Sequence, residues 1–155
     1  MIVAFASDHA GWPLRWRIIA EITALGFEAL DCGPAELVPG DDYPDRAEPV
    51  ARAVASGAAD RGILVCGSGV GAAIAATKVR GIRACMCHDT FSARQGVEDD
   101  DMNVIALGAR VIGEELAAVL IREFLSARFS GAERHRRRLE KVVAIERREG
   151  LTSKG

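Results

Sequence analysis

Short apolar runs alternate with amphipathic stretches along this chain, and this alternation limits the possible folds more than any other feature. The apolar runs predict buried strands at residues 1–6, 27–30, 62–65, 82–86 and 104–107. The stretches between and after them are amphipathic, rich in small residues or basic, and predict helices at residues 12–25, 46–56, 72–78, 114–128 and 133–148. Strands that alternate with helices form a parallel sheet covered on both faces. The sequence therefore predicts an α/β fold: a Rossmann-like three-layer sandwich with a five-stranded parallel sheet and a C-terminal basic helix.

Length and composition fit one globular domain. The chain has 155 residues, of which 49% are hydrophobic and 27% charged, so it is long enough to bury a core. We predict a single domain over residues 1–155, with residues 149–155 as a flexible tail. The net charge of −2 provides no positive field that would attract nucleic acid or an anionic membrane. We therefore expect neither of these partners.

The sequence also contains no recognisable membrane or export segment. Its start lacks a basic stretch and reaches Asp8 too soon for a signal peptide, and no apolar run approaches the ~20 residues that span a bilayer. The four cysteines include no C-x-x-C pair. Reduced thiols fit this pattern better than a disulfide framework does, so the expected location is cytoplasmic.

Polar residues directly follow several of the predicted strands. Residues 7–9 follow the first strand, residues 66–71 the third, and His88 and Asp89 the fourth. In a doubly wound sheet, ligands bind beyond the carboxyl ends of the strands. A loop of about ten residues rich in Pro, Gly and Asp precedes Pro44, and loops of that length are usually functional. We therefore expect a binding site at this edge of the sheet.

The segment CGSGVG, residues 66–71, joins a predicted strand to a predicted helix. Its three alternating glycines let the backbone turn sharply and direct several N–H groups to one point, where the helix adds positive potential. Such a cradle suits a phosphate or an oxyanion formed during a reaction. As a dinucleotide fingerprint it is weak, because Ala72 occupies the last glycine position and no acidic residue follows ~20 positions later. A nucleotide-binding module remains an alternative that rests on this loop alone.

Cys66 lies at the mouth of this cradle. A helix N-terminus favours the thiolate form of a cysteine, which is reactive. Position alone is equally consistent with a small buried core residue, and Ser68 is also consistent with a helix N-cap. The remaining cysteines, Cys32, Cys85 and Cys87, are predicted to be inert core residues.

Several motifs of this chain occur together, in the same order, in one protein family. They are Ser7-Asp8-His9-Ala10-Gly11, Asp42-Tyr43-Pro44-Asp45, GILVCGSGVG at residues 62–71, Gly81-Ile82-Arg83-Ala84, Asp101-x-Asn103-Val104 and Leu107-Gly108-x-Arg110-Val111-Ile112-Gly113. The chain resembles the type B ribose-5-phosphate isomerase family, which also contains the galactose-6-phosphate isomerase subunits. The resemblance extends from residue 1 to about residue 148.

This resemblance implies an activity and an assembly. The family has a Rossmann-like fold and forms homodimers, often paired into tetramers, with active sites at the subunit interface. It needs no metal or other cofactor and interconverts aldose and ketose phosphates through a cis-enediolate. We expect ribose 5-phosphate and ribulose 5-phosphate as the substrate pair. Erythrulose 4-phosphate, a hexose 6-phosphate and a non-catalytic subunit role remain alternatives.

The resemblance also implies catalytic roles. Cys66 matches the base that moves a proton between carbons 1 and 2 of the sugar. The enediolate is held by an anion hole that matches Ser68 and the amides of Gly67, Gly69 and Gly71. A second branch of the family uses a glutamate in the glycine loop as its base. This chain has Ala72 there and therefore falls in the cysteine branch.

Further residues match the substrate contacts of the family. The sugar is expected to contact Asp8, His9 and Tyr43. The phosphate carries about two negative charges, which planar guanidinium groups bind bidentately. The matching arginines are Arg110, Arg134 and Arg138. The remaining expected contacts are Asp99, Asp100 and Asn103.

The chain departs from the family in one acidic segment. Family members usually carry His-Asn-Asp where residues 99–101 are all aspartate, so the histidine assigned to opening the furanose ring is missing. With Glu98 this makes four consecutive acids, which we expect in a loop beside the substrate. Either an aspartate, His88 or spontaneous opening replaces the histidine, or the substrate is a tetrose phosphate that needs no ring opening. Consecutive acids in a loop more often face water than bind metal, so we predict no metal site.

Overall fold

The computed structural model describes residues 1–152, and its strands form one parallel sheet. Within these residues the strands are β1 (Ile2–Ser7), β2 (Glu28–Asp31), β3 (Arg61–Cys66), β4 (Ala84–Met86) and β5 (Val104–Gly108). Their order across the sheet is β2-β1-β3-β5-β4, and every neighbouring pair is parallel. The central strands β1, β3 and β5 are almost wholly buried, as their apolar sequences require. The predicted five-stranded parallel sheet is confirmed.

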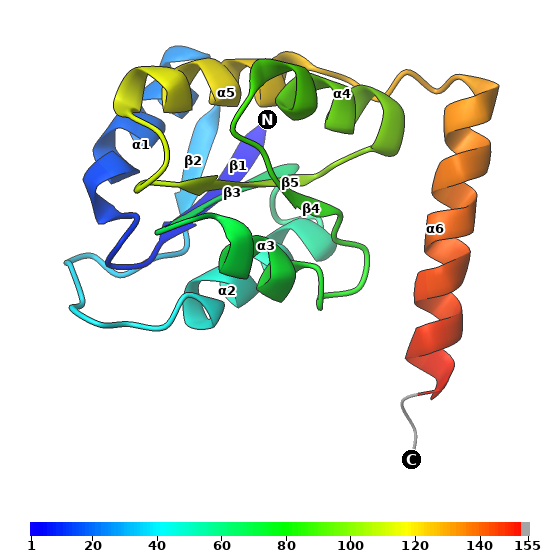
Figure 1. The fold of residues 1–155 in the computed structure, drawn as a ribbon, viewed down its shortest axis with the longest axis horizontal. Coiled ribbons are helices and arrows are strands. Elements are labelled where there is room, and N and C mark those ends of the chain that lie inside the picture. The colour runs from blue at the N-terminus through cyan, green and yellow to red at the C-terminus, as the bar shows by residue number, and fades with distance from the viewer. Residues whose placement is uncertain (153–155) are drawn as a thin grey trace.

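Helices cover both faces of the sheet (Figure 1). One face carries α1 (Arg15–Ala24), α4 (Thr90–Asp100) and α5 (Glu114–Ser126), and a 3₁₀ turn (Trp12–Leu14) leads into α1. The other face carries α2 (Pro44–Ala55) and α3 (Val70–Ala76). Each face has its own apolar core, with Phe5 and Phe124 on the first side and Val50 and Leu64 on the second. The predicted three-layer arrangement is therefore also confirmed.

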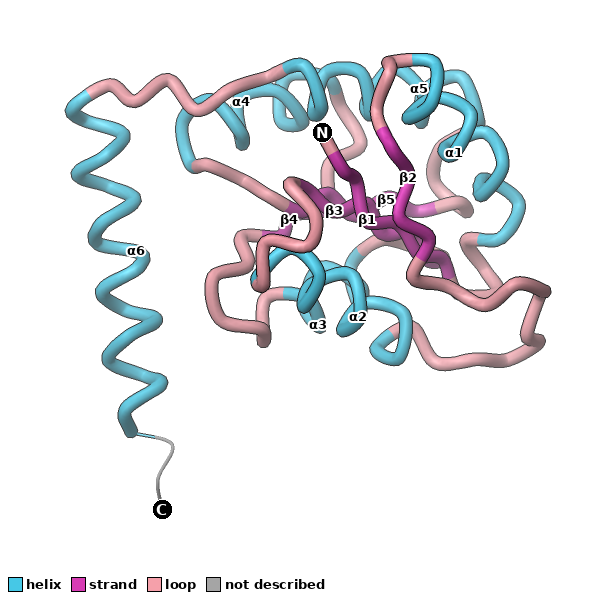
Figure 2. Tube along the Cα trace, turned by 180° about the vertical axis from the view of Figure 1, so that it is seen from behind, coloured by secondary structure: helices cyan, strands magenta, loops and turns pink. Residues whose placement is uncertain are grey.

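The last helix, α6 (Glu133–Thr152), stands apart from the three layers (Figures 1 and 2). It confirms the predicted basic C-terminal helix and extends it to Thr152. Residues 149–152, expected to belong to a flexible tail, thus continue the helix, and residues 153–155 lie outside the described part of the chain. None of the helices within residues 1–152 combines the length and the apolar content that crossing a membrane requires.

Helix α4 was not predicted, and the acidic run belongs to it. Asp89 caps its N-terminus by accepting a hydrogen bond from the Ser92 amide (2.7 Å). Glu98, Asp99 and Asp100 form the last turn, and Asp101 ends the helix with a φ of 53°. The expected acidic loop is therefore wrong for residues 98–100. The helix has few buried side chains, Ala93 and Val97, so its apolar stripe is too narrow to recognise in the sequence.

The connections that follow β1 and β3 run to opposite faces of the sheet and leave a crevice between these two strands. The connection after β1 leads to α1 on one face of the sheet, whereas the connection after β3 leads to α3 on the other face (Figure 1). The carboxyl ends of these adjacent strands thus open between diverging loops, which is the usual ligand position in doubly wound sheets.

Candidate active site

A cavity of about 320 Å³ occupies this crevice. Its walls come from the loop after β1, the start of α2, the glycine loop after β3 and the turn after β5. The lining residues are Asp8, His9, Ala10, Tyr43, Cys66, Gly67, Ser68, Gly71, Arg110 and Val111. Eight residues predicted from the sequence to form the site therefore lie around one cavity.

Cys66 ends β3 with its side chain at the floor of this cavity. The residue is only 4% exposed and also belongs to the apolar core on the α2–α3 face. It is therefore both a buried core residue and part of the cavity wall, the two positions that the sequence allowed. The amide of Gly69 donates a hydrogen bond to its Sγ atom (3.1 Å). Hydrogen bonds from N–H groups stabilise a sulfur anion more than a neutral thiol. The glycine loop thus directs one of its N–H groups at the sulfur.

The backbone of the glycine loop depends on residues without side chains. Gly69 has a φ of 83°, in the left-handed region that favours glycine, and it forms the N-cap of α3. Ser68 is not the N-cap, although its Oγ accepts a hydrogen bond from the Val70 amide (3.3 Å). A Cβ at Gly71 would lie 2.7 Å from the Tyr43 ring, so this glycine lets the aromatic ring close over the loop.

Arg110 brings positive charge to the same loop. Its amide donates to the carbonyl of Gly67 (3.0 Å), which ties the turn after β5 to the glycine loop. The guanidinium carbon would lie 3.5 Å from a Cβ at Gly67, so the side chain extends across that residue. Such a group can bind an anionic end of a small ligand.

The loop after β1 contributes two polar side chains. Asp8 is buried, and its Oδ1 accepts a hydrogen bond from the Gly11 amide (2.8 Å), which shapes the loop. His9 is half-buried, and its Nδ1 lies 3.0 Å from Oδ1 of Asp41. Asp41 is not among the residues predicted from the sequence to form the site. The only signal for it was the Pro-, Gly- and Asp-rich loop that contains it.

Six predicted site residues do not line this cavity: Gly69, which belongs to the glycine loop itself, and five that lie elsewhere in the chain. Asn103 bonds the backbone of Gly81 and Arg83 through its amide group. Asp99 and Arg134 both contact His135: Oδ1 of Asp99 lies 3.3 Å from its Nδ1, and Nε of Arg134 donates a hydrogen bond to its Nε2 (2.9 Å). The other two predicted contacts outside the cavity are Asp100 and Arg138.

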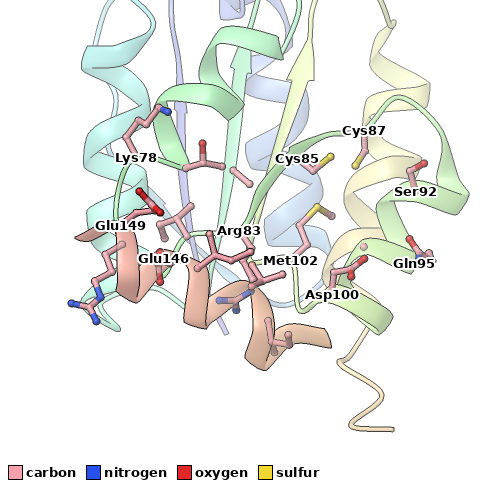
Figure 3. Close-up of a pocket in the computed structure, with 18 of the residues that line it drawn as sticks. Lys78, Arg83, Cys85, Cys87, Ser92, Gln95, Asp100, Met102, Glu146 and Glu149 are labelled. Carbon is pink, nitrogen blue, oxygen red and sulfur yellow. The ribbon is translucent and has the colours of Figure 1, made fainter. Parts of the chain in front are cut away.

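A second hollow, of about 1100 Å³, separates α6 from β4 and α4 (Figure 3). Its lining includes Asp100 and apolar side chains from both walls: Ile82, Met102, Leu139, Val142 and Ile145.

Two of the remaining cysteines also line this hollow (Figure 3). Cys87 is buried, as predicted, and burial together with the neighbouring Cys85 raises its pKa to about 12, so it stays protonated at neutral pH. Cys85 is exposed because it lies on the edge strand β4, and the prediction of a core position was wrong there. Cys32 is half-buried, and burial raises its pKa.

His88 contacts the end of β5, next to the glycine loop. Its Nε2 accepts a hydrogen bond from the Gly108 amide (2.9 Å), and burial lowers its pKa. A Cβ at Gly108 would lie 2.6 Å from the Ser68 carbonyl, so the two backbones are in close contact. His88 therefore acts as a neutral acceptor that holds the turn beside the glycine loop.

These features together define a class of protein: a doubly wound domain that acts on a small anionic molecule. A doubly wound sheet carries a thiol, a set of backbone N–H groups and a guanidinium at its switch-point crevice, which suits chemistry on a small anionic molecule. Within residues 1–152, no group of three or more His, Cys, Asp or Glu side chains is arranged to hold a metal ion.

Comparison with known proteins identifies the family. The model of the ribose/galactose isomerase family matches residues 3–142. Ribose-5-phosphate isomerase B of Escherichia coli (strain K12) is 44% identical over 146 residues, which cover 94% of this chain and 97% of that protein. D-erythrulose-4-phosphate isomerase of Pectobacterium atrosepticum is 42% identical over 129 residues, covering 83% and 85%. The structure of ribose-5-phosphate isomerase B from Clostridium thermocellum aligns with a TM-score of 0.91 at 42% identity, covering 96% and 99%. The chain belongs to the ribose/galactose isomerase family, as its motifs predicted.

The role of His88 predicts how stability depends on pH. Because its pKa in the folded protein lies below the ordinary value of 6.5, the unfolded chain binds more protons in the interval between the two values. His88 should therefore lower the free energy of unfolding as the pH falls from about 6.5 through the folded-state value. The variant His88→Gln keeps an acceptor for the Gly108 amide and should lack this contribution. Urea unfolding between about pH 7.5 and 5 measures it, and identical pH slopes in both proteins would contradict the assignment.

Proposed function

We propose that this protein is an aldose–ketose isomerase of a small sugar phosphate, with ribose 5-phosphate and ribulose 5-phosphate as its main substrate pair. The observation that carries the proposal is the Cys66 thiol in the cavity, with the Gly69 amide on its sulfur and Arg110 beside the glycine loop. The relatives that bear the name ribose-5-phosphate isomerase B support it. The reaction transfers protons only and requires no redox cofactor.

The proposed chemistry follows from the groups around Cys66. The thiolate takes the proton from the carbon beside the carbonyl and returns it to the former carbonyl carbon, through a cis-enediolate. In the same reaction the hydroxyl proton passes from the oxygen on the carbon that was deprotonated to the former carbonyl oxygen. Removing such a proton is feasible only when the resulting oxyanion meets preorganised donors. The Ser68 hydroxyl and the amides of Gly67 and Gly71 are available for this. The Gly69 amide instead stabilises the sulfur.

We also infer that the active unit is a homodimer. Among the described residues that line the cavity, Arg110 is the one arginine, whereas the substrate phosphate carries about two negative charges. Arg134 and Arg138 lie on α6, which stands away from its own sheet (Figure 2). We propose that a second copy packs beside α6, so that the active-site cavity of each chain receives Arg134 and Arg138 from the other.

Exposed apolar side chains support this assembly. Val70 and Ile74 lie one turn apart on α3, and Val142 and Ile145 lie on α6, each about half exposed. Apolar patches on a protein surface commonly mark interfaces with other molecules. We further propose that the protein works in the cytoplasm, because a thiol base requires a reducing compartment.

The role of Cys66 predicts a specific loss. Cys66→Ala should lower kcat by about 10²–10⁴-fold, the usual contribution of a general base, while the substrate still binds. Exchange of the substrate proton with solvent deuterium, followed by NMR, measures the step directly. Cys85→Ala removes an exposed thiol outside the cavity and is the matched control. Wild-type exchange in Cys66→Ala would exclude this thiol as the base.

A four-carbon substrate is the second candidate, and the contacts of Asp99 favour it. Its carboxylate pairs with His135 (3.3 Å) and accepts a hydrogen bond from Gln95 (2.8 Å), so it is occupied within its own chain. A tetrose 4-phosphate has no free hydroxyl that closes a five-membered ring, so it needs no ring-opening residue. The relative from Pectobacterium atrosepticum is named for such a substrate.

A substrate comparison separates these two candidates. If the protein acts mainly on the tetrose, kcat/KM for erythrulose 4-phosphate should exceed that for ribose 5-phosphate, and Asp99→His should improve only the pentose reaction. A much higher kcat/KM for ribose 5-phosphate would reject the tetrose. Hexose 6-phosphates belong in the same screen. Inactivity of the purified protein on every sugar phosphate would instead favour a non-catalytic subunit.

The shared site predicts complementation between inactive variants. Cys66→Ala and Arg138→Ala should each lose most activity as homodimers. When the two are refolded together, half of the dimers are mixed and each mixed dimer holds one intact site, so activity should return to about a quarter of wild type. Replacing Arg138→Ala by the double variant Cys66→Ala/Arg138→Ala gives the control, which has no intact site in any pairing. No recovery in the first mixture would contradict a site built from two chains.

A further inference from the structure

The loop between β2 and α2 places one buried carboxylate behind the active-site cavity. Most of this loop is exposed, but the Asp41 side chain is only 5% exposed. Its Oδ1 accepts a hydrogen bond from the backbone amide of His9 (2.7 Å), and its Oδ2 accepts one from Nε of Arg46 (2.7 Å). Asp41 thus ties this loop to His9, which precedes the loop in the sequence, and to Arg46 in α2, which follows it.

The same carboxylate determines which nitrogen of the His9 ring carries the hydrogen. Nδ1 of His9 lies 3.0 Å from Oδ1 of Asp41 and 3.2 Å from the Asp41 carbonyl oxygen. Both oxygens are acceptors, so Nδ1 must carry the hydrogen. The hydrogen bond at one ring nitrogen fixes the state of the other. Nε2 is therefore the nitrogen left to contact a ligand, and the ring lines the cavity with 38% of its side chain exposed.

Asp41 is charged at neutral pH. Burial acts to raise its pKa, but the hydrogen bonds from Arg46 and His9 outweigh burial and hold that pKa below its ordinary value. Arg46 balances the negative charge on the side away from the ring. The other charged or titratable groups that share the cavity with His9 are Asp8, Tyr43, Cys66 and Arg110.

We propose that Asp41 is a positioning residue of this site, which holds His9 as the Nδ1–H tautomer and so presents Nε2 to the substrate. The nature of that substrate rests on the proposed function, whereas the tautomer does not. The long loop before α2 then has a defined role: it carries the carboxylate that orients a residue of the β1 loop, 32 positions earlier.

The tautomer can be tested without any substrate. The chain has three histidines, so the ¹⁵N signals of the His9 ring can be assigned by comparison with His9→Gln. At a pH where the ring is neutral, we expect Nδ1–H in the wild type and a shift toward Nε2–H in Asp41→Ala. Glu36→Ala removes a carboxylate from an exposed position of the same loop and should leave the signals unchanged. An Nε2–H ring in the wild type, or no change in Asp41→Ala, would overturn the proposal.

A double-mutant cycle tests whether Asp41 acts through His9. Asp41→Ala should lower kcat/KM about tenfold in the wild-type background and less than about twofold in His9→Gln. Asp41→Asn retains an acceptor and should recover part of the loss, which guards against a folding defect. Equal losses in both backgrounds would mean that Asp41 acts by another route. If no sugar phosphate is isomerised by the wild type, the proposed function fails, while the NMR result still decides the role of Asp41.

Discussion

The pairing of β3 with β5 continues beyond the last residues of both strands, and the site depends on this junction. Cys66 is the register partner of Gly108, and the Arg110 amide then donates to the Gly67 carbonyl (3.0 Å). Because Gly108 has no side chain, the backbone of Ser68 can lie directly against it. A thiol, a hydroxyl and a guanidinium are thus fixed relative to one another by backbone contacts at the centre of the sheet, where the structure is most rigid.

The fold could be predicted because each central strand is a short apolar run and most of the crossover helices have a clear apolar stripe. The runs at β1, β3 and β5 needed no information beyond their own residues. Helix α4 could not be recognised in this way. Its buried side chains are Ala93 and Val97, and its last turn is acidic, so it is held by capping and by packing against α5 rather than by a strong local signal.

The site was predictable where its residues lie close together in the sequence, and less predictable where it depends on tertiary contacts. The glycine loop identified Cys66 and Ser68 from local spacing, and the family motifs added Tyr43 and Arg110; all four line one cavity. Asp41 was missed because its importance arises only when the fold brings a long loop against His9. The positions of the α6 arginines also depend on how α6 leaves the body of the protein, which no local pattern encodes.

Most of α6 lies away from the sheet (Figure 1), although its Glu146 accepts a hydrogen bond from the Gly81 amide (2.7 Å). The groups proposed to move the proton belong to the sheet and its first loops, whereas Asp99 and the distal arginines belong to α4 and α6. The contact between Asp99 and His135 joins α4 to α6, and neither residue lines the cavity. Substitutions there can alter which ligand is accepted while the proton-transfer groups stay in place.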